Sequence, residues 1–460
     1  MKVYARRLFD GFEVRDDVLV DVADGVITAV QGRPAAVPED TVRVEFLLPG
    51  LIDSHGHLAG FRDGGPREAL PAAARNHLRL SLQAGVTTMR ELGNYLEPID
   101  LARGWSAGQD GPRIYRAGPL LDGPKPLWSN SRAVADADDA KRHVSVLAVE
   151  GVDLIKTYGR LGPDVLPAVV DAAREHGLPV AAHCGRTTAR QAARAGVSSI
   201  EHLSHVIDED LLGGPADGLT DPHTSRPERL VRAWSRVDPD GPAADRLLAD
   251  LIEHRTVLCP TLLVTRRSVL FHEQLADRHL ELGTLVMPHH RHLIRMRNPL
   301  GLWFGRKFLP PDFPDPDLRG DAKREVEGGL AAMTGLLARA FAAGVVVVAG
   351  TDAPSSSVIP GHSLHQEIAA LVEAGLPATA ALSAATGNAG RLIGDGRLGV
   401  IAPGAFADLV AVSGDPSRDI TDLSKITAVM CRGTWVDRDA LRKRLNADLE
   451  NVLAHDPSEK

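Results

Sequence analysis

The sequence is short of cysteine and of long apolar runs, and each shortage excludes a class of protein. The three cysteines, Cys184, Cys259 and Cys431, are too far apart for a disulfide framework or a Cys-x-x-Cys metal site, which favours a reducing compartment. The longest apolar stretches, such as residues 342–350, are far too short to cross a bilayer. The N-terminal segment lacks the apolar core of a signal peptide. We therefore expect a cytoplasmic protein without a membrane partner.

An excess of positive charge is also missing. The formal net charge is −8, from 52 lysines and arginines against 60 aspartates and glutamates, so we expect no basic face for a nucleic acid. What the chain does have is 460 residues with 44% hydrophobic side chains, enough for one large domain and an accessory domain. We expect a small-molecule substrate as the partner, and the composition leaves a homo-oligomer open.

Both ends of the chain carry the alternating pattern of β-strands. Residues 2–46 contain several such runs, and Asp24-Gly25 between two of them is a hairpin signal. The pattern returns near the C-terminus in ADLVAV and AVMCRG. Neither piece can bury enough apolar surface by itself, so we predict that the two ends join in one small antiparallel β-sandwich domain.

Between the two ends, short apolar runs alternate with Ala- and Leu-rich helical runs, which is typical of βα units. The pattern predicts an α/β fold, a (β/α)8 or TIM barrel, with the active site at the C-terminal ends of its strands. Two connections, 204–256 and 263–344, are too long for simple loops, and we expect them to shape the mouth of the site. The predicted strands are 46–55, 87–92, 113–118, 153–158, 179–184, 199–203, 257–262 and 345–352. The predicted domains are the β-sandwich at 1–48 plus 396–440, the barrel at 49–395 and a C-terminal tail at 441–460.

Histidines and an aspartate stand at the C-terminal ends of these predicted strands. His55 and His57 lie two residues apart, so both point to the same side of the first strand. His183, His202 and Asp352 end the fifth, sixth and eighth strands. A single strand-end histidine is more often a hydrogen-bonded structural residue. Five such groups at one level of a barrel instead predict a metal site, because imidazoles and carboxylates are common metal ligands.

Lys156 stands near the end of the fourth predicted strand. Its ordinary interpretation is a surface lysine or an ion pair at the edge of the core. Burial at the barrel mouth would lower its pKa and make the neutral amine available for covalent chemistry. Reaction with CO2 would then give a carbamate, whose two oxygens can bridge two metal ions.

The order His-x-His, Lys, His, His, Asp on strands one, four, five, six and eight resembles the amidohydrolase superfamily. LPGLIDSHGH, VDLIKTYG, SIEHLSH, AGTDAP and GVIAPGAFADLVAV are similar to its landmarks, and the resemblance covers nearly the whole chain. PGHSLHQEIAALVEAGL and ALSAATGNAGRLIG are typical of the imidazolonepropionase-like branch that includes Xaa-Pro dipeptidases (prolidases) with a carboxylated lysine. After the third strand, however, many relatives carry Gly-Gly-His where this chain has GPLLDGPKPLWSN, which weakens any transfer of substrate identity.

The resemblance implies two divalent metal ions, with zinc as the first expectation and manganese or cobalt left open. A hydroxide shared by the ions would attack an amide or peptide-like bond. Asp352 would act as the catalytic proton carrier to the departing amine. The implied metal ligands are His55, His57 and Asp352 for one ion, His183 and His202 for the other, and carboxylated Lys156 (N6-carboxylysine) as the bridge.

Four further residues are candidates for substrate binding. Tyr158 and Arg186 each follow a candidate ligand closely and could bind a substrate carboxylate, although a packed tyrosine or a surface arginine is about as common. His205 lies in the connection after the sixth strand, where a solvated loop histidine is the ordinary alternative. His362 follows the eighth strand, where helix capping or support of a ligand is equally open.

The leading hypothesis is a metal-dependent hydrolase of amide bonds, either dipeptidase- or prolidase-like or acting on N-acyl amino acids. A mononuclear deaminase or a cyclic imidazolone hydrolase on the same fold is the alternative, and it would have no use for a bridging carbamate at Lys156. A lactonase or phosphotriesterase-like hydrolase is a second alternative, since the same hydroxide attacks those centres. A non-catalytic descendant is disfavoured, because all six ligand positions are kept.

Overall fold

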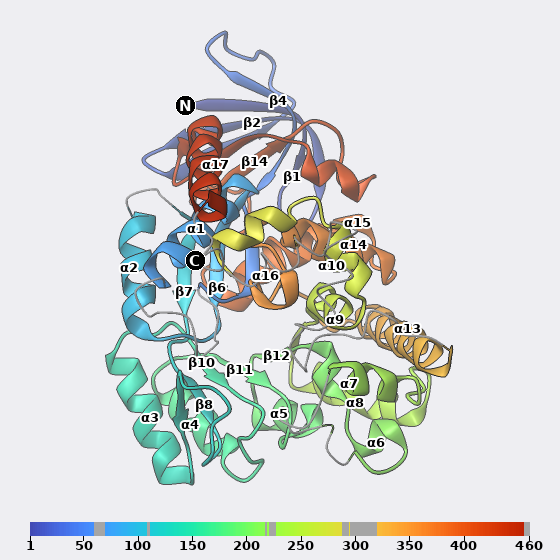
Figure 1. Ribbon diagram of the computed structural model, residues 1–460. Coiled ribbons are helices and arrows are strands. Elements are labelled where there is room, and N and C mark those ends of the chain that lie inside the picture. Colours follow the sequence, from blue (N-terminus) through green and yellow to red (C-terminus); the bar gives the residue numbers. More distant parts are fainter. Residues whose placement is uncertain are drawn as a thin grey trace.

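The computed structural model describes residues 1–58, 70–107, 111–216, 219, 227–287, 294 and 320–454. A seven-stranded sheet lies at one end of the molecule, and a barrel of parallel strands surrounded by helices forms the rest (Figure 1). Among the described segments, no helix combines the length and the apolarity needed to span a bilayer.

The seven-stranded sheet contains strands from both ends of the chain, as predicted for the β-sandwich domain. β14 pairs antiparallel with β4, and Leu409 lies opposite Pro49. Asp24 and Gly25 have positive φ values of 50° and 77° and connect β2 to β3, which confirms the hairpin. The sheet is not wholly antiparallel: β1 and β4 pair in parallel, because the chain crosses from β3 at the sheet edge to the far side of β1. The strands are β1 (Lys2–Phe9), β2 (Val14–Ala23), β3 (Val26–Gly32), β4 (Val42–Pro49), β14 (Leu409–Val412), β15 (Ile426–Cys431) and β16 (Thr434–Trp435).

The barrel strands follow one another in chain order and pair in parallel. Two short strands share the third position, because β7 pairs with β6 whereas β8 pairs with β10. β9 (Ser131–Ala133) extends the sheet beside β8. The barrel strands are β5 (Leu51–Gly56), β6 (Val86–Glu91), β7 (Arg113–Arg116), β8 (Leu120–Asp122), β10 (Ile155–Thr157), β11 (Val180–His183), β12 (Ser199–Glu201) and β13 (Val257–Cys259).

The eighth predicted strand, 345–352, closes the barrel without forming a regular strand. Single bridges join Val347 to Leu258 of β13 and Ala353 to Gly56 of β5. The approach at Gly350 is very close: a Cβ there would lie 2.6 Å from both the Sγ of Cys259 and the Cβ of His55. Glycine is therefore needed where this segment passes between its two neighbours.

Helices cover the outside of the barrel and fill the described parts of both long connections. α5 shows how local sequence sets a helix: Thr188 and Gln191 form a capping box at its start, and Gly196, with φ of 90°, ends it. The barrel helices are α1 (Leu70–Gln83), α2 (Leu96–Ala107), α3 (Ala137–Val149), α4 (Leu166–Glu175), α5 (Ala189–Ala195), α14 (His362–Glu373), α15 (Ala378–Ala384) and α16 (Gly387–Ile393).

The two long connections, 204–256 and 263–344, are largely helical where the structure describes them. Arg232 of α7 and Glu325 of α13 form an ion pair between the two connections. We expected these connections to shape the mouth of the site. Part of that expectation concerns residues 217–218, 220–226, 288–293 and 295–319, which lie outside the described residues. The helices are η2 (Leu203–Val206), α6 (Glu209–Leu212), α7 (Pro227–Trp234), α8 (Pro242–Glu253), α9 (Leu262–Val269), α10 (Phe271–Ala276), η3 (Leu280–Leu285) and α13 (Gly320–Ala342).

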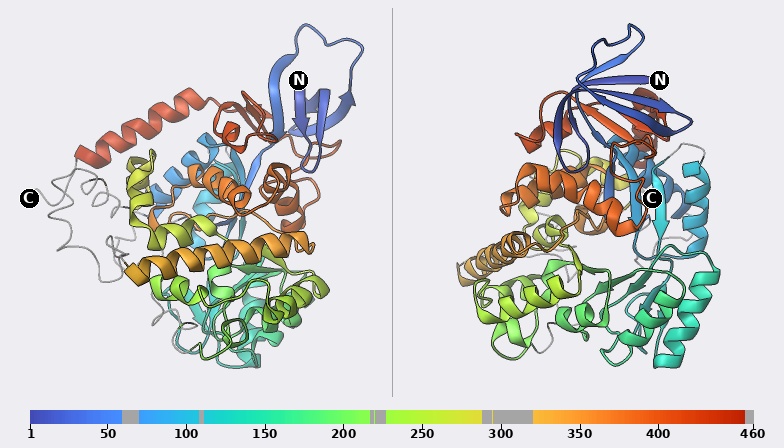
Figure 2. Two further views of the ribbon diagram at one scale, coloured as in Figure 1. Left: turned by 90° about the vertical axis from the view of Figure 1, so that its right-hand side faces the viewer. Right: turned by 180° about the vertical axis from the view of Figure 1, so that it is seen from behind.

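The segment predicted as a C-terminal tail is helical in its described part. α17 (Arg438–Ala454) extends from the seven-stranded sheet (Figure 2). Leu441 and Leu445 of α17 are buried against Leu82 of α1 and Leu285 of η3. Burial of these leucines explains why the segment is a docked helix rather than a loose end.

Candidate metal centre

The C-terminal ends of the barrel strands bring the candidate ligands together. His55 and His57 lie at the end of β5, and their ring centroids are 5.3 Å apart. The ring of His202, which follows β12, lies 4.5 Å from that of His55 and 4.8 Å from that of His183 at the end of β11. Asp352 completes the group from the segment that closes the barrel. Ligand atoms of His55, His57 and Asp352 all lie within 4.8 Å of one another.

The hydrogen bonds around His57 and His55 direct lone pairs toward Asp352. His57 donates through Nδ1 to the carbonyl oxygen of Gly93 at 3.3 Å. Burial lowers the pKa of His57 to about 4, so the ring is neutral and its Nε2 carries a lone pair. That Nε2 lies 3.0 Å from Oδ1 of Asp352, and the Nε2 of His55 lies 3.4 Å from the same oxygen. Electron-pair donors facing one another in this way fit a bound cation.

His183 and Lys156 carry buried nitrogen atoms that lack partners. Neither ring nitrogen of His183, nor the Nζ of Lys156, has a hydrogen-bond partner in the described part of the chain. Burial lowers the pKa of His183 well below its usual range and that of Lys156 to about 8. Unpaired buried polar atoms are rare and costly in folded proteins, so they indicate something that binds there. Neutral imidazoles and a buried amine of lowered pKa fit a site that holds a divalent metal ion.

Three residues that the sequence motifs did not indicate hold the histidines in place. The Nδ1 of His55 donates to Oε2 of Glu201 at 2.8 Å, and the guanidinium of Arg90 also donates to that carboxylate. Although burial would raise the pKa of Glu201, the charge of Arg90 holds it well below its usual range. The Nδ1 of His202 lies 2.9 Å from Oγ1 of Thr261. Such contacts orient histidine ligands and fix their tautomers. Arg90 and Glu201 are charged residues inside otherwise apolar barrel strands, and this pattern could have indicated them from the sequence.

We expect Glu201→Gln to weaken metal binding by about 10- to 100-fold, because His55 loses its orienting carboxylate. The free energy of unfolding should fall by about 3 kcal/mol, since Arg90 keeps a buried charge without its partner. Competition with a chromophoric chelator measures the first effect and urea denaturation measures the second. Glu327→Gln, on the exposed face of α13, should change neither quantity. Unchanged metal affinity in Glu201→Gln would show that Glu201 has no role in the site.

The structure brings two of the four predicted substrate-binding residues to the cluster. The ring centroid of Tyr158 lies 4.4 Å from that of His183, at an interplanar angle of 30°. The ring centroid of His205 lies 4.3 Å from that of His183. Arg186 lies just beyond the end of β11 and is exposed. Its guanidinium has no ion-pair partner among the described residues.

His362, a candidate for substrate binding, is not brought to this cluster. It stacks on His279 with ring centroids 3.8 Å apart and lines a different cavity. The cause is a turn at Gly361, with φ of 73°, that sets the start of α14 against α1. A Cβ at Gly361 would lie 2.6 Å from the carbonyl oxygen of Leu80.

A parallel barrel with this cluster at the C-terminal ends of its strands defines a class, the barrel hydrolases that use divalent metal ions. The sequence matches the family model described as "Amidohydrolase family" over residues 46–436. The chain therefore belongs to the amidohydrolase family and is a metal-dependent hydrolase of that family.

Relatives and solved structures agree with this placement. An uncharacterised protein of Mycobacterium tuberculosis is 27% identical over 430 residues, 90% of each chain. The ochratoxinase of Aspergillus niger is 26% identical over 267 residues, 45% of this chain and 55% of the relative. A crystal structure of a Xaa-Pro dipeptidase with bound methionine has a TM-score of 0.65 at 21% identity and covers 95% of this chain and 99% of the other. That of A. niger ochratoxinase has a TM-score of 0.65 at 19% identity and covers 94% of each chain.

Proposed function

We propose that the protein hydrolyses the amide bond of a small substrate that carries a free carboxylate, such as a dipeptide or an N-acyl amino acid, with two metal ions in its site. The observation that carries the proposal is a set of buried nitrogens on Lys156 and His183, beside the His55–His57–Asp352 group, that have no partner in the part of the chain that the structure describes. A single ion could use the latter three residues alone. A second ion would give a partner to the Lys156 and His183 nitrogens, which have none among the described residues.

His55, His57 and Asp352 would hold the first ion, and His183 and His202 would hold the second. Lys156, as its carbamate, would bridge them, with its CO2 supplied by the solvent. Divalent ions in such a site lower the pKa of water so that it attacks at neutral pH, and they polarise the scissile carbonyl.

Asp352 carries the proton in this proposal. Its carboxylate is exposed by 17%, more than the histidines beside it, so it can reach a substrate. The carboxylate accepts a proton from the attacking water and donates it to the departing amine nitrogen. Amines leave amides readily only when protonated, so this transfer allows the C–N bond to break.

The predicted preference for a carboxylate rests on Arg186. Arg186 follows His183 by three residues and is exposed, and its guanidinium, which has no ion-pair partner among the described residues, can donate two hydrogen bonds to a carboxylate. Tyr158 and His205 flank His183 and would border the bound substrate. The name of the Xaa-Pro dipeptidase among the similar structures describes a substrate with both an amide bond and a free carboxylate, which supports this class.

The test combines metal analysis with a substrate panel. Removal of metal by a chelator should abolish activity, and zinc, manganese or cobalt should restore it at about two ions per chain. N-acyl amino acids and dipeptides should be hydrolysed at least about tenfold better, in kcat/KM, than their C-terminal amides. Arg186→Gln should remove that preference, while Arg174→Gln, on the exposed face of α4, should not. A full complement of one ion would favour the mononuclear deaminase or imidazolone hydrolase, and preference for a lactone or phosphotriester would overturn amide hydrolysis.

A further inference from the structure

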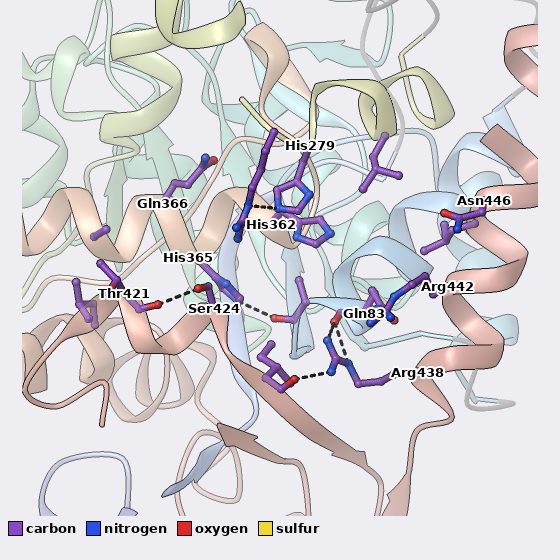
Figure 3. Close-up of a pocket in the computed structure, with 17 residues that line it drawn as sticks. Gln83, His279, His362, His365, Gln366, Thr421, Ser424, Arg438, Arg442 and Asn446 are labelled. Carbon is purple, nitrogen blue, oxygen red and sulfur yellow. Dashed lines mark hydrogen bonds between the residues drawn. The ribbon is translucent and has the colours of Figure 1, made fainter. Parts of the chain in front are cut away.

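A cavity of about 470 Å³ lies away from the metal centre between α1, η3, α14, η5 (Ile420–Ser424) and α17 (Figure 3). None of the six candidate metal ligands lines it. Its volume falls within the range of sites that bind small molecules. The cavity includes His362, the predicted substrate-binding residue that the structure places apart from the cluster.

Positive charge is gathered around this cavity without matching carboxylates. Arg278, Arg438 and Arg442 line it, and no aspartate or glutamate does so among the described residues. Arg442 has a weak ion pair, at 3.7 Å, with the exposed carboxylate of Asp439 on the same helix. Arg278 donates through Nε to Nε2 of His279 at 3.0 Å. Three guanidinium groups thus face one space with little to neutralise them.

Arg438 is held in position before any ligand arrives. It donates from Nη2 to the carbonyl oxygen of Gln83 at 3.0 Å and from Nη1 to that of Ile426 at 2.8 Å. Burial, and then the charge of Arg442 four residues along α17, lower the pKa of Arg438. Like charges at this spacing on a helix repel each other. An anion between them would relieve that repulsion.

The rest of the lining offers stacked aromatic rings, apolar side chains and one buried hydrogen-bond acceptor. His279 and His362 stack at an interplanar angle of 19°, and burial lowers the pKa of both, so the pair is neutral (Figure 3). Leu282 and Leu445 add apolar surface. The side-chain oxygen of Gln83, which is 7% exposed, has no hydrogen-bond partner in the described part of the chain. A ligand that fits has an acidic head and an apolar body.

We propose that this cavity is a binding site for a small organic anion, separate from the metal centre. The acidic head lies among Arg278, Arg438 and Arg442, and the apolar body lies against the stacked His279–His362 pair. Because the cavity shares no residue with the proposed active site, the proposal stands whether or not the protein hydrolyses amides.

Isothermal titration calorimetry of the metal-loaded protein tests this with three probes. Naphthalene-1-sulfonate should bind one per chain, and naphthalene-1-sulfonamide, its neutral counterpart, should bind at least about tenfold more weakly. Inorganic sulfate, which lacks the apolar body, should also bind at least about tenfold more weakly. The double variant Arg278→Gln/Arg442→Gln removes two exposed charges and should lower the affinity for the sulfonate by about tenfold or more.

Lys443→Gln is the matched control, since Lys443 is an exposed cation beside Arg442 that does not line the cavity. This variant should bind the sulfonate like the wild type. The double variant should keep the wild-type thermal unfolding and hydrolytic activity, because neither arginine touches the metal centre. The proposal would be overturned if the double variant bound the sulfonate as tightly as the wild type does. It would also be overturned if the wild type bound the sulfonamide or sulfate as tightly as it binds the sulfonate.

Discussion

Replacement of Asp352 by asparagine is expected to lower kcat for the proposed amide substrates by about 10³-fold or more. The carboxylate faces both His55 and His57 and is the proposed proton carrier to the leaving amine. Loss of a general acid–base group typically costs about 10²- to 10⁴-fold in rate, and loss of a charged metal ligand adds to it. Asparagine has nearly the same volume, so the fold should persist. Steady-state kinetics and metal content, measured on the same preparation, check the result.

Asp171→Asn provides the control for this variant. Asp171 lies on the exposed face of α4, where it pairs with Arg174 at 2.8 Å. Exposed pairs of this kind contribute little to stability, so kcat should stay at the wild-type value. A fall of less than about tenfold in Asp352→Asn, with metal content unchanged, would show that Asp352 is neither the proton carrier nor an essential ligand.

Lys156→Met should raise the stability of the metal-free protein and lower its hydrolytic activity. The unmodified amine is buried and lacks a hydrogen-bond partner among the described residues, so it should destabilise the metal-free protein. Methionine fills the same space without a polar head. We therefore expect the metal-free variant to gain about 1 to 3 kcal/mol in the free energy of unfolding. The same variant should bind one metal ion in place of two and lose most of its activity, because no carbamate can form.

A carbon NMR measurement and a control variant complete this test. Protein equilibrated with ¹³C-bicarbonate and metal should show a carbamate carbon signal by NMR, and Lys156→Met should lack it. Lys323→Met, at an exposed position of α13, should retain the signal, both metal ions and full activity. Two bound ions and wild-type kcat in Lys156→Met would rule out a bridging lysine. A loss of stability without metal would show that Lys156 has a structural partner.

The strand positions near the site were predictable because their signals are local. An apolar run that ends in a polar residue marks the mouth of a parallel barrel, and His55, His183 and His202 are placed by that rule alone. The hairpin at Asp24-Gly25 depends on two residues that accept positive φ. The closing segment was harder to foresee. Its regular strand is replaced by isolated bridges, because Gly350 must pass within contact distance of Cys259 and His55, which lie far away in the sequence.

By itself, the sequence determined the order of the candidate ligands, the barrel that carries them and the sheet shared by the two termini. Each of these depends on short-range periodicity or on apolar surface that must be covered. The tertiary structure alone decided which groups support the candidate ligands: Glu201 bonds to His55 and Arg90, and Thr261 contacts His202. It also decided that His362 lines a cavity apart from the metal centre. Such contacts join residues far apart in the chain. Their energy depends on burial in the folded protein, which cannot be predicted from a local sequence pattern.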